Sequence, residues 1–265
     1  MGAAIELLTG IVTAPGATIT AVTMATGNSL TVRNTRLDAE IHLLQGWVDS
    51  QVGGIFRLRS PQFHDNVQGI RLRHIPSEVD PLLPENSRQK LMPQDTMVME
   101  LSGSTIAGDI ESACLLLYYS DLPGISARFI DEAQLRTRGI HVLTVENSLA
   151  LGTAGGYSGE EAINAEFDLL KANTDYAILG YQVDVECAAV RYRGSDFGNL
   201  GIGGPGNETD KRTTGEWFVR LSRLMGTPLV PVFNSANKAG LLLDGVQDEN
   251  GTDVIVSTIL VELGP

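Results

Sequence analysis

Short apolar segments separated by turn residues run through the whole chain and predict an all-β protein. In the first half the strand-like segments are Thr18–Met24, Glu40–Val48, Gly54–Arg59, Ile70–His74, Thr96–Leu101 and Ser112–Tyr119. In the second half they are Ile140–Val145, Tyr176–Val185, Ala188–Arg193, Glu216–Leu221, Leu229–Phe233 and Val254–Glu262. Strands at this spacing, with Gly, Pro, Asn and Asp between them, indicate a sandwich or barrel rather than alternating βαβ units.

One segment of the second half, Ser158 to Lys171, has a helical pattern instead. Ser158 is a suitable N-cap, and Glu161 follows three residues later, as a capping box requires. The apolar face of this expected helix is supplied by Ala162, Ile163, Ala165, Phe167, Leu169 and Leu170. We therefore expect a short helix in the second half.

The same four blocks of residues occur twice, in the same order. Gly46-Trp47 matches Gly180-Tyr181, and Arg57-Leu58-Arg59 with Phe63, Asn66, Gly69 and Ile70 matches Arg191-Tyr192-Arg193 with Phe197, Asn199, Gly201 and Ile202. Leu82-Leu83-Pro84 with Asn86, Ser87 and Lys90 matches Leu229-Val230-Pro231 with Asn234, Ser235 and Lys238, and Asp109-Ile110 with Leu115–Leu117 matches Asp253-Val254 with Ile259–Val261. Four matched blocks in register order indicate two tandem copies of one fold.

The repeat predicts how the chain is divided. Residues 1–122 form the first copy, residues 123–138 the connection, where Pro and Gly come first and charges are frequent, and residues 139–265 the second copy. A copy of this size can close its own core. Because Trp47 and Tyr181 each follow a matched glycine, we expect them to be equivalent buried anchors of the two copies.

Composition limits the function classes without naming one. The chain has 265 residues, of which 43% are hydrophobic, and a net charge of −13 from 19 Lys+Arg and 32 Asp+Glu. This acid excess argues against sequence-independent binding of nucleic acid, which depends on basic residues. The apolar runs, such as Cys114–Tyr119, are too short for a membrane helix, and no basic segment with an apolar run opens the chain, so we expect no secretory signal. Two cysteines fit a protein that folds in a reducing cytoplasm.

Motifs of catalysis and ligand binding are weak or missing. Gly201–Gly206 fits G-x-G-x-x-G, but the polar residues after it lack an apolar helical face and Pro205 removes an N–H, so a turn-rich loop is favoured over a dinucleotide site. The four histidines, His42, His64, His74 and His141, are scattered, and neither H-E-x-x-H nor G-x-S-x-G occurs. We therefore expect no catalytic, cofactor-binding or metal-binding residues and no enzyme activity.

Three further features leave alternatives open. The acidic group Asp244, Asp248, Glu249, Asn250 and Asp253 resembles a calcium loop but lacks EF-hand spacing, so a solvated loop is favoured.

The arginine pairs Arg57/Arg59 and Arg191/Arg193 each lie on one sheet face. They either form a polar outer face or pair with carboxylates of a neighbouring subunit. The apolar N-terminal segment Met1–Gly16 either docks on a partner or forms a strand of its own barrel.

The chain resembles the double jelly-roll major capsid proteins of tailless icosahedral viruses. The resemblance rests on Phe56-Arg57-Leu58-Arg59 to Ile70, the stretch Leu229–Lys238, and the closing strands Ser112–Tyr119 and Val254–Glu262. It covers nearly the whole chain as architecture, and the length is similar to that of the compact members in membrane-containing bacteriophages. It implies two eight-stranded jelly-roll barrels standing upright in a virion shell.

The resemblance also implies the partners of this chain. Three subunits would form a homotrimer, a pseudo-hexameric capsomer, and many capsomers would tile an icosahedral shell with minor capsid or membrane proteins. The protein would be made in the host cytoplasm and reside in the virion, without gripping nucleic acid directly and without a cofactor.

Two other classes remain as alternatives. A duplicated β-sandwich binding module for carbohydrate or a receptor explains the repeat as well, but it would require exposed aromatic residues, and only two Trp and six Tyr exist. A bicupin-like enzyme is the third candidate, although that fold normally holds its metal with clustered histidines.

Overall fold

The computed structural model describes residues 2–24, 30–75, 89–150, 156–163, 169–185, 187–206, 214–246 and 253–265. The first half contains β1 (Ala4–Thr13), β2 (Thr20–Ala21), β3 (Thr23–Met24), β4 (Ile41–Asp49), β5 (Gly54–Arg59), β6 (Ile70–His74), β7 (Gln89–Lys90), β8 (Val98–Ser102) and β9 (Ile110–Tyr119). These strands form two antiparallel sheets: sheet I, in the order β3-β1-β9-β4-β7, and sheet II, in the order β2-β8-β5-β6. Together the two sheets are the first sandwich.

The second half contains β10 (Phe129–Ile130), α1 (Glu132–Arg138), β11 (Gly139–Leu149), β12 (Glu161–Ala162), β13 (Asp175–Val183), β14 (Cys187–Arg193), β15 (Ile202–Gly206), α3 (Trp217–Met225), β16 (Val230–Asn234), the 3₁₀ helix η1 (Ser235–Gly240), β17 (Leu242–Val246) and β18 (Val254–Leu263). Sheet III has the order β12-β17-β14-β15, and sheet IV the order β10-β16-β13-β18-β11. These two sheets are the second sandwich. Within the described ranges, no helix is long and apolar enough to cross a membrane.

Both sandwiches have jelly-roll strand order. With β3 and β10 set aside as additional short strands, each half supplies eight strands to two sheets of four. Counted along each half, the sheets then read 1-8-3-6 and 2-7-4-5 in both sandwiches. The predicted all-β tandem jelly-roll fold is confirmed, and sheets I and II are the counterparts of sheets IV and III.

The sequence repeat coincides with this structural repeat. Gly46 and Gly180 lie on the counterpart strands β4 and β13, and Arg57 and Arg191 lie on β5 and β14. The matched block at Leu82–Ser87 lies outside the described residues. The exact domain boundaries at residues 122 and 138 stay predictions.

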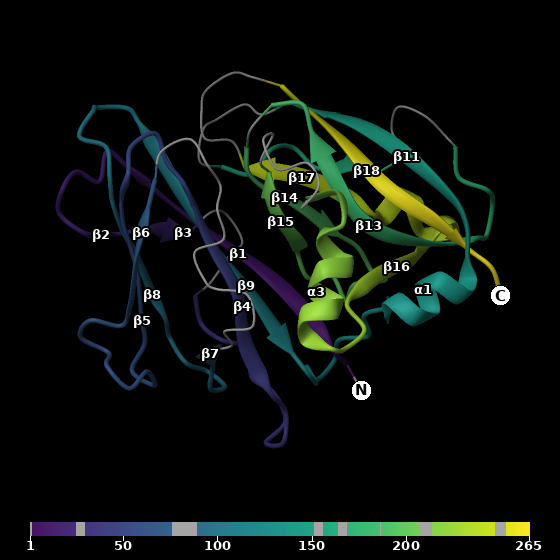
Figure 1. Ribbon diagram of the computed structural model, residues 1–265, viewed down its shortest axis with the longest axis horizontal. Coiled ribbons are helices and arrows are strands. Elements are labelled where there is room, and N and C mark those ends of the chain that lie inside the picture. Colours follow the sequence, from purple (N-terminus) through teal and green to yellow (C-terminus); the bar gives the residue numbers. More distant parts are fainter. Residues whose placement is uncertain are drawn as a thin grey trace.

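The four sheets are stacked in the order II, I, III, IV, which Figure 1 shows from left to right. The first core, between sheets II and I, holds residues such as Leu8, Phe56 and Leu115. The opposite face of sheet I, with Leu7, Trp47, Cys114, Leu116 and Tyr118 among its residues, belongs to the same buried cluster as the interior of the second sandwich. Sheet I is therefore buried on both faces, and the two sandwiches share a continuous interior.

Trp47 and Tyr181 are both fully buried, as the sequence predicted, but the prediction that they are equivalent is wrong. A side chain at Gly46 would point toward Phe56 in the first core, so the next residue, Trp47, points the other way, toward sheet III. A side chain at Gly180 would meet Thr214 and Gly215 outside the second core. Tyr181 therefore points into its own sandwich, where its hydroxyl donates to the Pro205 carbonyl over 3.0 Å.

Two predicted helix and strand assignments are wrong. Ser158 does not begin a helix: its backbone and side chain bond with Gly245 of β17, and residues 161–162 form strand β12. Residues 164–168 of that expected helix lie outside the described residues. The expected strand Glu216–Leu221 belongs instead to α3, whose buried residues Trp217, Phe218 and Leu221 repeat with a helical period. Gly226, in the left-handed conformation at φ 61°, ends this helix.

Two further segments form strands: the N-terminal segment, for which the sequence left two alternatives, and Gly201–Gly206, for which it predicted a loop. The N-terminal segment forms β1, which pairs with β9 along its whole length, so the barrel-strand alternative is confirmed. Ile202–Gly206 forms the fully buried strand β15 rather than a turn-rich loop. Its glycines allow close packing, since a Cβ atom at Gly204 would lie 2.5 Å from both the Trp217 ring and the Tyr181 hydroxyl.

Candidate functional site

A buried ion pair lies on sheet III where it faces the first sandwich. Arg191 on β14 and Asp244 on β17 are directly opposite each other in the ladder, and the Arg191 side chain is 9% exposed. The Arg191 Nε donates to Asp244 Oδ1 over 2.8 Å, and a second, short bond joins its Nη2 to Oδ2. Asp244 was expected in a solvated acidic loop; that prediction is wrong, because its carboxylate is committed to Arg191 inside the chain.

An aromatic residue ties this ion pair to the first sandwich. The Arg191 guanidinium lies 3.4 Å from the centroid of the Tyr157 ring, a cation–π contact. The Tyr157 hydroxyl lies 3.0 Å from Thr9 Oγ1 on β1. Burial works against the charged forms, and it raises the pKa of Asp244 despite the opposing Arg191 charge. Sequence reasoning missed Tyr157, a single aromatic residue in a glycine-rich segment that no motif singles out.

The counterpart ion pair in the first sandwich is more exposed to solvent. Arg57 on β5 lies opposite Glu100 on β8, and its Nε donates to Glu100 Oε2 over 2.5 Å. Arg59 adds two bonds of 2.9 Å to the same carboxylate. Arg57, Arg59 and Arg191 thus bond to carboxylates of their own chain, and pairing of the arginines with a neighbouring subunit stays a prediction.

Because of Glu100, the stability of the folded chain should depend on pH in the acid range. Burial raises the pKa of Glu100, but hydrogen bonds from Arg59 and Arg57 outweigh burial and hold it below its ordinary value of 4.5. A carboxyl with a lowered folded-state pKa stabilises the fold above its unfolded-state pKa and loses this contribution as the pH falls. We expect the melting temperature of Glu100→Gln to fall less than that of the wild type between about pH 5 and pH 3.

The matched control for this measurement is Asp253→Asn, which removes an exposed carboxylate just before β18. Its melting curve should follow the wild type over the same pH range. Parallel curves for Glu100→Gln and the wild type would contradict the predicted role of the Arg57–Glu100–Arg59 cluster.

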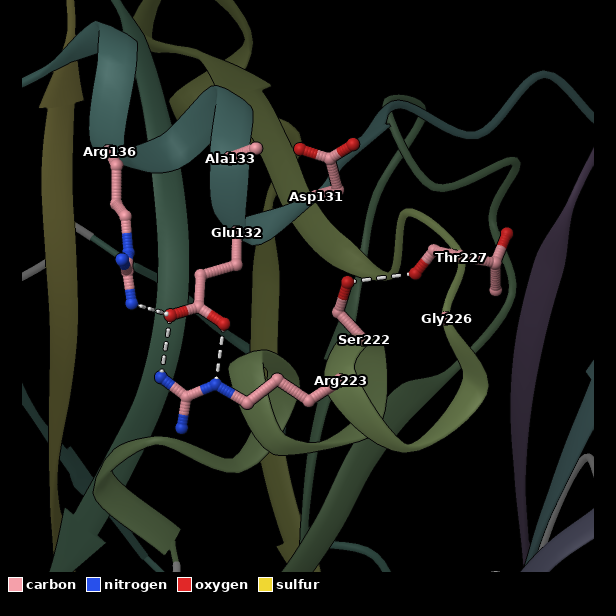
Figure 2. A pocket seen from close by; sticks show the side chains of 8 residues that line it. All are labelled: Asp131, Glu132, Ala133, Arg136, Ser222, Arg223, Gly226 and Thr227. Carbon is pink, nitrogen blue, oxygen red and sulfur yellow. Dashed lines mark hydrogen bonds and ion pairs between the residues drawn. The ribbon is translucent and has the colours of Figure 1, made fainter.

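A pocket of about 400 Å³ lies between α1 and α3. Figure 2 shows Glu132 of α1 pointing to Arg223 of α3 and to Arg136 one turn further along α1. Arg223 donates to both Glu132 oxygens over 2.6 and 2.8 Å, and Arg136 donates over 2.6 Å. Asp131, at the pocket rim, is the N-cap of α1 and forms a capping box with Gln134.

The charges in this pocket hold two helices together and are poorly suited to proton transfer. The hydrogen bonds from Arg223 and Arg136 lower the pKa of Glu132 to about 2. A carboxylate with so low a pKa is a weak base at neutral pH, far from the value that general catalysis favours. No sequence motif marks this cluster, because Arg223 lies far along the chain from Glu132 and Arg136.

The histidines, cysteines and acidic residues that the sequence offered as candidates do not gather at one site in the described residues either. Within the ranges that the structure describes, no group of three or more His, Cys, Asp or Glu side chains is placed to hold a metal ion. His42 on β4 lies 3.3 Å from Glu40, whereas His74 on β6 contacts the Ser102 carbonyl. Both cysteines are buried and neither forms a disulfide, and burial raises the pKa of Cys114 to about 12. Asp248, Glu249 and Asn250 of the predicted acidic group lie outside the described residues.

Comparisons with known proteins add only weak structural likenesses. No protein-family model and no curated protein matches the chain. Among solved structures, it is similar to the "PBSX exported protein XepA", with 9% identity, a TM-score of 0.28, and 96% of this chain and 86% of that chain covered. It is also similar to the "major capsid protein P2 from Bacteriophage PM2", with 9% identity, a TM-score of 0.23, and 99% and 98% of the two chains covered. At these scores neither likeness carries a functional argument, and the fold rests on the strand order above.

Proposed function

We propose that this chain is the major capsid protein of an icosahedral virus, a structural subunit rather than an enzyme. It acts as a homotrimer, a pseudo-hexameric capsomer, that contacts neighbouring capsomers and minor capsid or membrane proteins of the virion. It is made in the host cytoplasm, needs no cofactor, and does not bind nucleic acid directly. The resemblance in sequence pattern to double jelly-roll capsid proteins supports this proposal.

The observation that carries the proposal is the joining of two jelly rolls into one stacked body. Sheet I is buried on both faces, and Trp47 reaches across to sheet III, where its Nε1 donates to the Ala188 carbonyl over 2.8 Å. These buried contacts thus fix the two barrels relative to each other. A structural subunit requires such a fixed arrangement. The prominent ion pairs, Arg191–Asp244 and Glu132–Arg223, are likewise used inside the chain.

The binding-module alternative receives no support from the surface of the described residues. In those residues, the exposed large apolar side chains are all aliphatic or methionine, with Leu37, Val67 and Val142 the most exposed. Carbohydrate and receptor sites commonly use exposed aromatic rings, which supply contact area and a polar tip.

The proposal is tested by the state of the purified protein and its place in a particle. Sedimentation velocity and negative-stain electron microscopy should show a trimer, or shells, across a concentration series. The chain should also dominate the protein content of purified particles. A strictly monomeric protein that is absent from every particle would contradict the proposal.

Salt should affect the contacts between capsomers and the contacts within the trimer differently. Exposed ion pairs contribute only about 0–1 kcal/mol each and are screened by salt, whereas buried apolar contacts carry no charge for salt to screen. We therefore expect light scattering across a salt series to show capsomer-to-capsomer contacts loosening before the trimer dissociates. Simultaneous loss of both kinds of contact at one salt concentration would contradict this order.

A further inference from the structure

Two arginines on sheet II differ from most other described arginines in having no carboxylate partner. Most described arginines form ion pairs with carboxylates of their own chain: Arg33, Arg36, Arg57, Arg59, Arg128, Arg136, Arg138, Arg191, Arg193 and Arg223. Arg71 and Arg73 are both exposed on β6, and neither forms an ion pair with any part of the chain that the structure describes. Their charges are therefore not neutralised within the described residues.

These two arginines lie beside two others on the outward face of sheet II, at the left end of the stack in Figure 1. Arg71 is directly opposite Arg57 in the ladder between β5 and β6, so both side chains point to the same face. Arg73 and Arg59 each lie two residues further along their strands and therefore share this face. Phe56, next to Arg57, faces the first core instead. We call Arg57, Arg59, Arg71 and Arg73 the arginine face.

The arginine face carries more positive charge than its surroundings neutralise. Among the described residues, the carboxylate that bonds to it is Glu100 on β8, which accepts hydrogen bonds from Arg57 and Arg59. Like charges directly opposite each other on neighbouring strands destabilise a sheet, and Arg57 and Arg71 are such a pair. A chain with a net charge of −13 thus concentrates basic groups where strand pairing disfavours them. A bound anion would remove this repulsion.

We propose that the arginine face binds a compact anion with several linked phosphate groups, such as a triphosphate chain. This inference goes beyond the proposed function and does not rest on it. The planar guanidinium group of arginine donates paired hydrogen bonds to phosphate oxygens. The Cβ atoms of directly opposite residues such as Arg57 and Arg71 lie about 4.5–5.5 Å apart. Arg73 follows about 7 Å further along β6. Long side chains at this spacing can reach neighbouring phosphates of one ligand.

The size of the arginine face favours a compact anion over a long polyanion. The face is two strands wide and occupies two alternating positions on each strand. A nucleic acid strand carries one charge about every 3.4 Å, so it would extend past the arginine face along a chain whose remaining charge is strongly negative. A triphosphate concentrates its charge within the arginine face. A single phosphate offers too few oxygens for paired bonds from every arginine of the face.

The first test titrates the full chain with inorganic tripolyphosphate by isothermal titration calorimetry at about 50 mM salt, where phosphate contacts are weakly screened. We expect saturable binding of one ligand per chain. Arg71→Gln/Arg73→Gln should weaken this binding about tenfold or more, because the two arginines without a carboxylate partner are lost. Circular dichroism should match the wild type, because both side chains are exposed.

The matched control is Arg36→Gln/Arg136→Gln, which removes the same number of charges from exposed arginines outside the arginine face. This variant should bind tripolyphosphate like the wild type. Equal affinity of Arg71→Gln/Arg73→Gln and the wild type would overturn the inference, and so would a wild type that does not bind tripolyphosphate. Both results leave the capsid proposal standing, because assembly is measured separately.

Two further anions test the class of ligand. Inorganic phosphate and a single-stranded DNA of about 20 nucleotides should each bind about tenfold or more weakly than tripolyphosphate. Phosphate binding of equal strength would reduce the arginine face to an adventitious ion site only, and DNA binding of equal strength would assign the face to nucleic acid. Either result overturns the inference.

The melting temperature without any ligand tests the charge repulsion itself. Arg71→Gln removes the like charge opposite Arg57, so the variant should melt at the same temperature as the wild type or higher at low salt. Tripolyphosphate should raise the melting temperature of the wild type and leave that of Arg71→Gln/Arg73→Gln nearly unchanged. A ligand-free Arg71→Gln variant that melts below the wild type would mean that no repulsion is present for an anion to relieve.

Discussion

Replacing Trp47 with alanine is expected to lower the free energy of unfolding by about 3–5 kcal/mol, the range for truncating a buried aromatic residue. Trp47 is fully buried between the sandwiches, packs edge-on against Trp217 at a centroid distance of 6.1 Å, and donates a hydrogen bond to Ala188. The substitution leaves a cavity and removes the indole hydrogen bond to the Ala188 carbonyl at the same place. Chemical denaturation followed by fluorescence or circular dichroism measures the change.

A double-mutant cycle with Trp217→Ala separates the contact from the cavity. Because the two rings touch, their effects should not be additive, and the coupling should reach about 0.5–1.5 kcal/mol. Tyr181→Phe is the control inside the second sandwich; it keeps the ring and removes only the bond to Pro205. An unfolding free energy for Trp47→Ala close to that of the wild type would mean that the shared interior does not hold the sandwiches together.

The second large effect is expected at Arg191. Arg191→Met leaves the Asp244 carboxylate buried without its partner, which typically costs about 3–5 kcal/mol. The counterpart change, Arg57→Met, is a matched control, because Arg59 still donates two hydrogen bonds to Glu100. We expect the control to cost about 1 kcal/mol or less.

Lowering the pH should restore part of the unfolding free energy that Arg191→Met loses. This pH dependence distinguishes a buried charge without a partner from simple loss of packing. Burial already raises the pKa of Asp244, and removing Arg191 removes the opposing effect. The folded state then binds a proton more readily than the unfolded state, so folding becomes relatively more favourable as the pH falls. The gap in unfolding free energy between Arg191→Met and the wild type should therefore narrow from about pH 7 to pH 5. A gap that does not change with pH would show that Asp244 is not the buried charge without a partner.

Strand positions could be predicted from the sequence where side chains alternate clearly. Segments such as Gly54–Arg59 and Ile70–His74 were placed correctly because polar and apolar residues alternate and turn residues follow. Strand β15 was missed because close packing against Trp217 and Tyr181 requires glycines, and glycines carry no apolar pattern. Local sequence thus predicts a strand poorly where backbone approach, rather than side-chain burial, decides the residues.

The environment of charged and aromatic side chains was harder to predict. Asp244 lies among acidic residues in the sequence, and only the ladder between β14 and β17 places it beside Arg191. Trp47 and Tyr181 follow matched glycines, yet the strands β4 and β13 present them to different faces. A shift of one residue along a strand reverses the face, so the repeat predicted burial of both rings but not what each ring contacts.

The double burial of sheet I has a consequence for synthesis of the chain. The first sandwich is complete once β9 has emerged from the ribosome, but the strands that cover Leu7, Trp47 and Tyr118 end only at Gly206. At typical elongation rates this interval lasts on the order of ten seconds. During that time a nascent chain presents a large apolar sheet face to the solvent, a surface that hydrophobic-binding chaperones recognise. Slow translation across this interval should therefore favour aggregation, and faster delivery of β14 and β15 should suppress it.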